Sequence, residues 1–217
     1  MKENTTAKKE RAAKILSILQ IEYPDAWCSL HYKNPLQLLI STILSAQCTD
    51  ARVNAVTPKL FAKYKTAKDF ASASVAELES LIHSTGFYHS KAKNIISCCK
   101  KIVDEFGGRV PERMEDLVLL DGVGRKTANV VAFHAFGKAH GIAIDTHAFR
   151  ISRRLSLSAA STPEKMEKEL MLLLPPSIWG AYTNYMVLHG RKFCMARKPD
   201  CEACPLNKIC PSAFKLK

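Results

Sequence analysis

The sequence predicts an all-α fold, and three observations favour it. Apolar residues recur every three to four positions along most of the 217 residues, which is the spacing of amphipathic helices. No pair of segments alternates apolar and polar residues in the way that paired strands do. The connections between periodic segments are short, and neither a repeat nor a low-complexity linker interrupts them. A protein of packed helices with short connections follows.

Two segments carry the clearest helix signals. Asn34 followed by Pro35 is typical of a cap and a first helical position, and the run after it is apolar on all sides. This predicts a helix central to the core. From Tyr88 to Phe106, apolar residues fall on one face and polar residues on the other, so we expect an amphipathic helix there.

The other helices follow from periodicity and from proline. Thr162 and Pro163 are typical of a helix start, and Pro175 and Pro176 of its end. Further helices are expected at Lys8–Glu22, Ala51–Lys65, Val75–Ser84, Met114–Leu119, Arg125–Phe136, Thr146–Ser156 and Ile178–Phe193.

The charge balance indicates a polyanionic partner. The formal net charge is +12, from 32 basic and 20 acidic residues. Nucleic acid is the first candidate and an anionic membrane surface the second. No apolar run is long enough to span a bilayer, and the charged N-terminus lacks the apolar core of a signal peptide. We therefore expect no membrane association.

Eight cysteines could form disulfides, but a chain of this length does not need them, and no export signal is present. Four are spaced C-x6-C-x2-C-x5-C in a short polar segment, where core packing does not explain them. Such a set can hold zinc or an iron–sulfur cluster, because tetrahedral thiolate sites serve both. The candidate ligands are Cys194, Cys201, Cys204 and Cys210, and the nearby cations Arg191, Arg197 and Lys198 indicate a nucleic-acid contact.

Residues 112–136 carry a second signal, a helix–hairpin–helix with two glycines in its turn. Gly122 and Gly124 let the backbone take positive φ and approach a ligand closely. Free amides there and at the start of the next helix would form an anion site for a DNA phosphate, and Arg125 adds positive charge. The alternative is a plain chain-reversing corner.

Lys126 begins the second helix of this hairpin and has two interpretations. It could be a cation that only binds phosphate. It could also be a nucleophile, because a helix N-terminus repels an ammonium and partial burial disfavours one. Both effects favour the neutral amine that a nucleophilic lysine requires.

Asp145 follows an apolar pair and precedes a helix, so we expect it to be an N-cap. A capping carboxylate stays ionised, and in a cleft it can also stabilise a developing cation. His147, two residues further on, is either a neighbour of a phosphate or a structural histidine.

Four segments stand together in order: LSAQCTD (44–50), LDGVGRKTANVV (120–131), IDTHAFR (144–150) and LHGRKFC with the three later cysteines (188–210). Together they resemble endonuclease III, a family of bifunctional DNA glycosylases in the helix–hairpin–helix superfamily. The resemblance implies a six-helix barrel domain at residues 28–138 and a discontinuous cluster domain at residues 1–27 and 139–217. It also implies that the four cysteines hold a [4Fe–4S] cluster, and that the damaged base is flipped into the cleft between the domains.

The resemblance further implies residue roles. Lys126 matches the nucleophile, which attacks the anomeric carbon, forms a Schiff base and cuts the strand by β-elimination. Asp145 matches the family's essential carboxylate. Gln47 matches the residue that fills the gap left by the flipped nucleotide, and Phe87 stands where an aliphatic wedge is common. Asp121 replaces a common proline, so it is expected to point away from the phosphate site or to cap the second helix.

The expected enzyme removes oxidised pyrimidines from duplex DNA and cleaves abasic sites. It is expected to be a monomer in a prokaryotic cytoplasm, associated with the nucleoid. The alternatives are an adenine-mismatch or pyrimidine-dimer glycosylase of the same fold, or a noncatalytic DNA-binding module with a four-cysteine metal site. The lysine at position 126 disfavours the adenine-mismatch enzyme.

Overall fold

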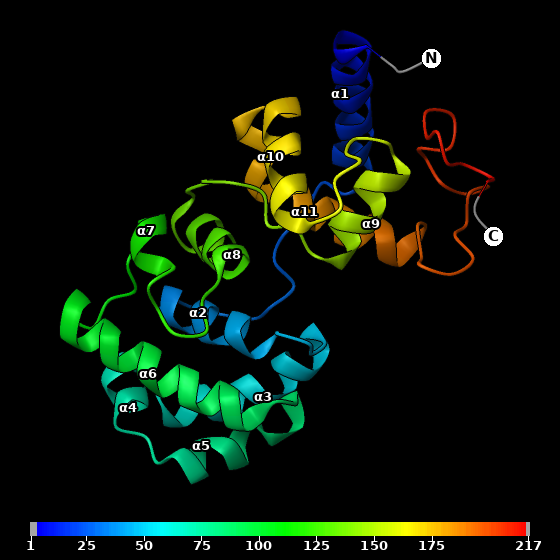
Figure 1. Cartoon of the computed structure of the whole chain (residues 1–217). Helices are drawn as coiled ribbons and strands as arrows, with labels where there is room; N and C mark the ends of the chain where they lie inside the picture. The colour runs from blue at the N-terminus through cyan, green and yellow to red at the C-terminus, as the bar shows by residue number, and fades with distance from the viewer. Residues whose placement is uncertain (1–3, 216–217) are drawn as a thin grey trace. The chain divides into compact units, whose positions relative to one another are not determined.

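The computed structural model describes residues 4–215, and none of these residues lies in a strand (Figure 1). The all-α fold is therefore confirmed. In chain order the helices are α1 (Thr5–Glu22), α2 (Pro35–Leu44), α3 (Asp50–Lys63), α4 (Ala67–Ala71), α5 (Val75–Ile82), the 3₁₀ helix η1 (His83–Thr85), α6 (Tyr88–Phe106), α7 (Met114–Leu117), α8 (Arg125–Phe136), α9 (Thr146–Arg154), α10 (Pro163–Leu173) and α11 (Pro176–Lys192).

Local capping explains where several helices begin. The Asn34 side chain accepts a hydrogen bond from the Gln37 amide at 2.9 Å, and Pro35 takes the first helical position. Pro175 and Pro176 differ from the expectation in one respect. α10 ends before them as expected, but Pro176 also begins α11, two residues earlier than the periodicity indicates. A proline suits the first turn because its missing N–H would have no partner there.

Helix α4 is not predicted by the sequence pattern. Its five residues span little more than one turn, so they show no periodicity. A capping box holds it instead, in which the Thr66 side chain and the Asp69 side chain each bond the other residue's backbone amide.

The chain divides into two compact units, and the first is Cys28–Lys138. It contains α2 to α8, and its core lies around α2, which is buried on all sides as expected. α2 packs against α8, and α6 packs against α4 and α5. The fully buried side chains at the centre include Leu38, Leu39, Phe70, Leu78 and Ile95.

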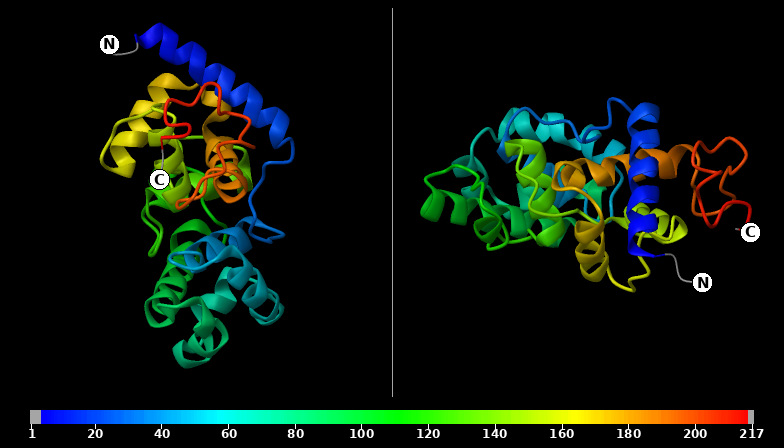
Figure 2. Two further views of the ribbon diagram at one scale, coloured as in Figure 1. Left: turned by 90° about the vertical axis from the view of Figure 1, so that its right-hand side faces the viewer. Right: turned by 90° about the horizontal axis from the view of Figure 1, so that it is seen from above.

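The second unit joins Met1–Trp27 with Ala139–Lys217. It contains α1, α9, α10 and α11, whose core includes Ile15, Leu19 and Met186. α11 packs against α9 and also against α1, and the Arg11 side chain of α1 donates to the Leu155 carbonyl at 2.6 Å. Figure 2 shows α1 running beside the C-terminal segment of the same unit.

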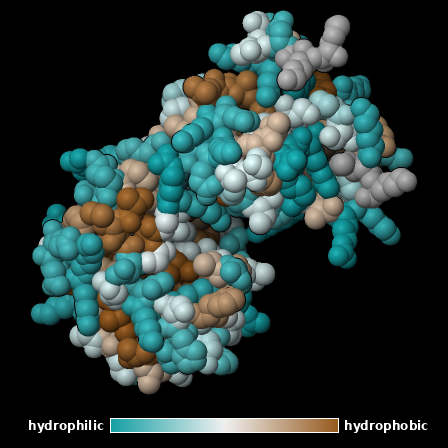
Figure 3. All heavy atoms as spheres, viewed as in Figure 1, coloured by the Kyte–Doolittle hydropathy of each residue, from teal (hydrophilic) through white to brown (hydrophobic). Residues whose placement is uncertain are grey.

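Some apolar side chains reach the surface. Figure 3 shows apolar patches among hydrophilic residues on the Cys28–Lys138 unit. Val118 and Leu119, which lead into the glycine turn, are 41% and 55% exposed. No helix among residues 4–215 is both long and apolar enough to cross a membrane.

Truncating Leu39 tests the centre of the first unit. Leu39 is fully buried, so Leu39→Ala should lower the free energy of unfolding by about 3 kcal/mol, through lost burial and the cavity left behind. Leu119→Ala is the matched control at an exposed position and should change the free energy of unfolding by less than about 0.5 kcal/mol. Urea unfolding followed by far-UV circular dichroism measures both, and equal losses would contradict the assignment of the core.

Candidate active site and metal centre

The hairpin turn between α7 and α8 requires glycine at one position. Gly122 has φ 77°, in the left-handed region, and it also packs closely on α6. A Cβ at this position would lie 3.0 Å from the Cβ of Asn94. Both the dihedral angle and the close approach to Asn94 therefore favour glycine here.

Gly124 corrects one expectation. Its φ is −82° and its ψ 174°, so it does not use the left-handed region that both glycines were expected to need. No protein atom lies within 4 Å of a Cβ built on it. The space beside Gly124 is open, and α8 begins after it with no side chain capping its amides. These two facts suit the close approach of an anion to the start of α8.

Asp121 points away from the start of α8. Its carboxylate accepts a hydrogen bond from the Ser97 hydroxyl on α6. The capping position of α8 is held by Gly124, so Asp121 does not cap this helix. Asp121 was expected either to point away from the phosphate site or to cap the second helix, and its bond with Ser97 agrees with the first arrangement.

Lys126 lies in the first turn of α8, directly after the turn, and its side chain is exposed. The partial burial that the sequence suggested for Lys126 is therefore not found. Arg125 beside it is also exposed. The two cations and the open turn form one positively charged surface.

Asp145 is the N-cap of α9, as its position in the sequence predicts. Its Oδ1 accepts a hydrogen bond from the Ala148 amide at 2.7 Å, and the residue is half-buried. An oxygen atom remains beyond the one that caps. Capping and a second role for the carboxylate are therefore geometrically compatible.

His147 lies in the first turn of α9 and is half-buried against α11. Its Nδ1 is 3.2 Å from the Arg150 guanidinium. Gly190 on α11 faces both side chains, and a Cβ there would clash with the His147 ring. Burial lowers the pKa of Arg150, which also donates to the Cys194 carbonyl at 3.0 Å. α9 is therefore tied to the segment that carries the cysteines.

Three residues expected to contact DNA have a left-handed backbone. Gln47, Phe87 and Lys198 have φ of 51°, 49° and 50°. Such angles cost non-glycine residues free energy and concentrate at functional sites. All three side chains are exposed, and Phe87 is 65% exposed, which is unusual for a phenyl ring. Arg191 and Arg197 are exposed as well.

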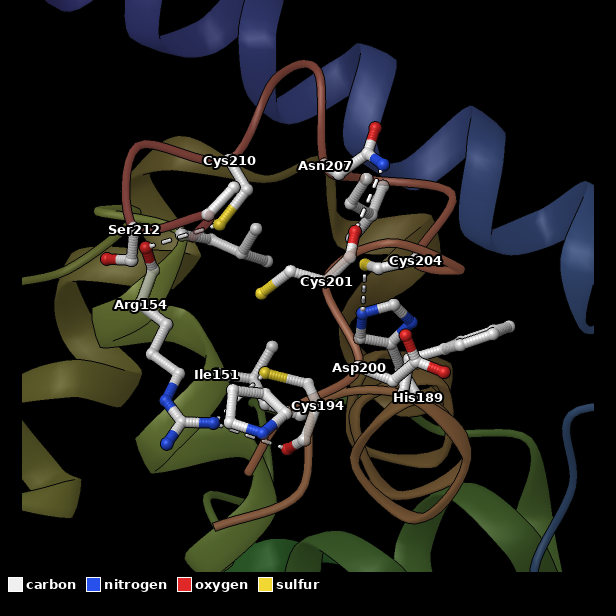
Figure 4. A pocket seen from close by; sticks show the side chains of 15 residues that line it. Ile151, Arg154, His189, Cys194, Asp200, Cys201, Cys204, Asn207, Cys210 and Ser212 are labelled. Atoms are coloured by element: carbon white, nitrogen blue, oxygen red, sulfur yellow. Dashed lines mark hydrogen bonds between the residues drawn. The ribbon is translucent and has the colours of Figure 1, made fainter. Parts of the chain in front are cut away.

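The four cysteines of the C-terminal segment line one pocket (Figure 4). None of the four is in a disulfide, and all four are half-buried. Apolar side chains of α9 and of the C-terminal segment form much of the remaining wall, including Ile151, Leu155 and Leu206. In Figure 4 the four sulfur atoms lie on the same side of the C-terminal segment, with that of Cys201 drawn between the other three.

The donor set fits an iron–sulfur cluster. Burial raises the pKa of the Cys204 thiol to about 11, so a bound cationic centre is needed to keep it ionised. Four thiolates from one short segment that line a single pocket are the ligand set that an iron–sulfur cluster uses.

Two residues beside the cysteines had no predicted role. Arg154 donates to the Cys194 sulfur at 3.3 Å and to the Met195 carbonyl at 2.6 Å. His189 is buried, with its Nε2 3.5 Å from the Cys204 sulfur and its Nδ1 3.2 Å from the Tyr23 hydroxyl. Burial lowers the pKa of His189 to about 4. His189 lies five residues before Cys194 in the sequence, which was the one available signal, whereas Arg154 lies 40 residues from Cys194 and only the fold brings it to the sulfur atom.

Comparisons with known families agree with this arrangement. Residues 40–176 match the family described as HhH-GPD superfamily base excision DNA repair protein, and residues 194–210 match the iron-sulfur binding domain of endonuclease III. The fold and site therefore define a base excision DNA repair protein of the helix–hairpin–helix superfamily.

Whole-length relatives identify the family within that class. The chain is 54% identical to endonuclease III of Synechocystis, over 95% of this chain and 94% of that protein. It is 42% identical to endonuclease III of Bacillus subtilis, over 93% and 96%. It therefore belongs to the endonuclease III family.

Solved structures are similar over the same length. The structure of a non-covalent endonuclease III–DNA complex has a TM-score of 0.90 at 42% identity, covering 95% of this chain and 97% of that one. A trapped endonuclease III–DNA covalent intermediate gives the same values. As a member of this family the chain is a DNA glycosylase and abasic-site lyase of base excision repair, acts on DNA and carries a [4Fe–4S] cluster.

Removing one thiol tests the metal centre. Cys201→Ser should lose the yellow-brown colour and most of the iron, because a serine hydroxyl is a poor substitute for a thiolate ligand. Cys28→Ser, at a half-buried cysteine outside the pocket, is the control and should keep both. Iron and sulfide analysis with visible absorbance measures the effect. Full iron content in Cys201→Ser would contradict the assignment of an iron–sulfur cluster to these cysteines, and so would a wild-type protein that is colourless and contains zinc.

Proposed function

We propose that this enzyme removes oxidised pyrimidines from duplex DNA and then cuts the strand at the abasic site, with Lys126 as its nucleophile. The observation that carries the proposal is the position of the Lys126 amine. It stands exposed in the first turn of α8, next to a turn with open space and uncapped amides. A phosphate bound at the turn would bring a deoxyribose within reach of this amine.

The chemistry proceeds in two stages. The neutral Lys126 amine attacks the anomeric carbon, the bond to the base breaks, and the base leaves with the electron pair and takes up a proton. The sugar ring opens to a protonated Schiff base. Loss of a proton from the neighbouring sugar carbon then expels the 3′ phosphate by β-elimination. The trapped covalent intermediate of a relative supports a covalent step of this kind.

The surroundings of Lys126 suit this role although the free side chain is exposed. The amine stands at the start of α8, beside the open turn where a phosphate would bind. Bound DNA would cover this surface and exclude water from the reacting atoms. Water exclusion would thus come from the substrate rather than from the protein.

Asp145 is the acidic partner in this proposal. Its carboxylate is held in one orientation by the bond from the Ala148 amide. An ionised carboxylate stabilises positive charge that develops on the sugar and assists proton transfers. His147, in the following turn, would contact a phosphate.

The DNA contacts fall into three groups. Gly122, Gly124 and Arg125 would bind a phosphate at the hairpin. Gln47 would fill the gap left by the flipped nucleotide, while Phe87 would stack against an unpaired base. The cations of the cluster segment, Arg191, Arg197 and Lys198, would contact the backbone.

The cluster and the setting complete the proposal. Cys194, Cys201, Cys204 and Cys210 would hold the [4Fe–4S] cluster, which would shape the basic segment between them. We further propose that residues 28–138 act as the barrel domain, that residues 1–27 and 139–217 act as the cluster domain, and that the enzyme works as a monomer. The bacterial relatives support a cytoplasmic enzyme that acts on the nucleoid.

Trapping with borohydride tests the nucleophile. Wild-type protein and duplex DNA containing thymine glycol should give a covalent adduct, because borohydride reduces the Schiff base to a stable amine. Lys126→Gln should lose the adduct and lower turnover by roughly 10³-fold or more. Lys100→Gln, at an exposed lysine of α6, is the control and should behave as wild type. An undiminished adduct in Lys126→Gln would place the Schiff base elsewhere.

Asp145→Asn separates the carboxylate's charge from its capping role. Asparagine caps a helix about as well as aspartate, so stability and DNA affinity should stay near the wild-type values. Turnover should fall by roughly 10²-fold, because the negative charge beside the reacting sugar is lost. Single-turnover kinetics with thermal unfolding as the fold control measures this. Normal turnover would show that Asp145 is only a cap.

A further inference from the structure

Lys91 on α6 is a buried cation outside the machinery described so far. It is 4% exposed, although it is only the fourth residue of its helix. Its ammonium donates to the Leu44 carbonyl at 2.7 Å and to the Thr85 carbonyl at 2.8 Å. Among residues 4–215 no carboxylate forms an ion pair with it, and both of its hydrogen bonds go to backbone carbonyls.

The two carbonyls belong to the ends of two other helices. Leu44 is the last residue of α2, and Thr85 is the last residue of η1. Carbonyls at a helix end have no partner within the helix, and they carry the negative end of the helix dipole. One ammonium thus satisfies two helix ends that lie 41 residues apart along the chain.

Each of these helix ends leads directly into an exposed residue with strained backbone. Gln47 follows Leu44 by three residues and Phe87 follows Thr85 by two. Their φ values are 51° and 49°, and Gly86 between Thr85 and Phe87 has φ 69°. Strained dihedrals persist only where the surrounding structure holds them in place. The two bonds of Lys91 fix the backbone just before each strained position.

A role in packing alone does not explain a lysine at this position. Burying an ammonium costs free energy, and burial lowers the pKa of Lys91, an effect that the nearby Cys48 opposes. An apolar side chain would avoid this cost and fill the same space. Only a long side chain with several donors reaches both carbonyls at once.

We propose that Lys91 is a positioning residue that fixes the Gln47 loop and the Phe87 loop relative to each other, so that both enter the duplex together when the damaged nucleotide leaves it. This inference rests on the proposed roles of Gln47 and Phe87. Lys91 itself touches no DNA. It acts by keeping the two loops in one arrangement before binding, so that opening the duplex does not also require ordering them.

The test compares substrates that do and do not need the duplex to be opened. Lys91→Met keeps the length and removes the donors, and Lys100→Met, on the exposed face of α6, is the matched control. On duplex DNA with thymine glycol, Lys91→Met should release base about tenfold more slowly than wild type, in line with the coupling of contacting residues. On a single-stranded abasic oligonucleotide, Lys91→Met should cut the strand at nearly the wild-type rate, because no duplex has to be opened. Lys100→Met should match the wild type on both.

A second measurement separates positioning from a loss of fold. In the Gln47→Ala/Phe87→Ala background, adding Lys91→Met should slow base release by less than twofold, since Lys91 acts through those two side chains. A tenfold loss that persists in this background, or equal losses on both substrates, would overturn the proposal and leave Lys91 a structural residue. Base release is scored after chemical cleavage of the abasic product, so this result does not depend on whether Lys126 is the nucleophile. Cluster absorbance and circular dichroism confirm that each variant is folded.

Discussion

A helix leaves amides without partners at its start and carbonyls without partners at its end, and this constraint organises the functional surface of the protein. The start of α8 has no capping side chain and stands beside open space, which suits an anion. The start of α9 is capped by Asp145, which fixes a carboxylate. The ends of α2 and η1 share the ammonium of Lys91. Under the roles proposed above, phosphate binding, catalysis and the positioning of two loops would each use unpaired backbone groups at helix ends.

The sequence predicts the bounds of a helix well where the helix is long enough to show a clear period. It fails where contacts made only in the folded protein decide the local structure. The bounds of α6 and α8 match the expected ranges because each helix has several turns of clear periodicity. The five residues of α4 are too few to show a period. Gly124 was expected at positive φ, but the turn needs only one such residue, and Gly122 provides it.

The residues of the candidate site likewise include some that the sequence predicts and some that it does not. Cysteine spacing predicts a metal centre because all its donors lie in one short segment. Arg154 and His189 reach the sulfur atoms from α9 and α11, and Lys91 reaches two distant carbonyls, so no local pattern marks them. Through Arg150 and Arg154, the helix that Asp145 caps is bonded to the backbone of Cys194 and Met195. Loss of the cluster would therefore also disturb the support of α9.

The left-handed residues bear on attempts to make this enzyme more robust. Gln47, Phe87 and Lys198 each store conformational free energy in one dihedral angle. Exchanging any of them for glycine would relax that angle and tend to raise the melting temperature, yet it would remove a side chain to which we assign a DNA contact. Under those proposed roles, thermostability and DNA binding compete for the same three backbone positions, and heat-stable versions are better sought in the cores of the two units.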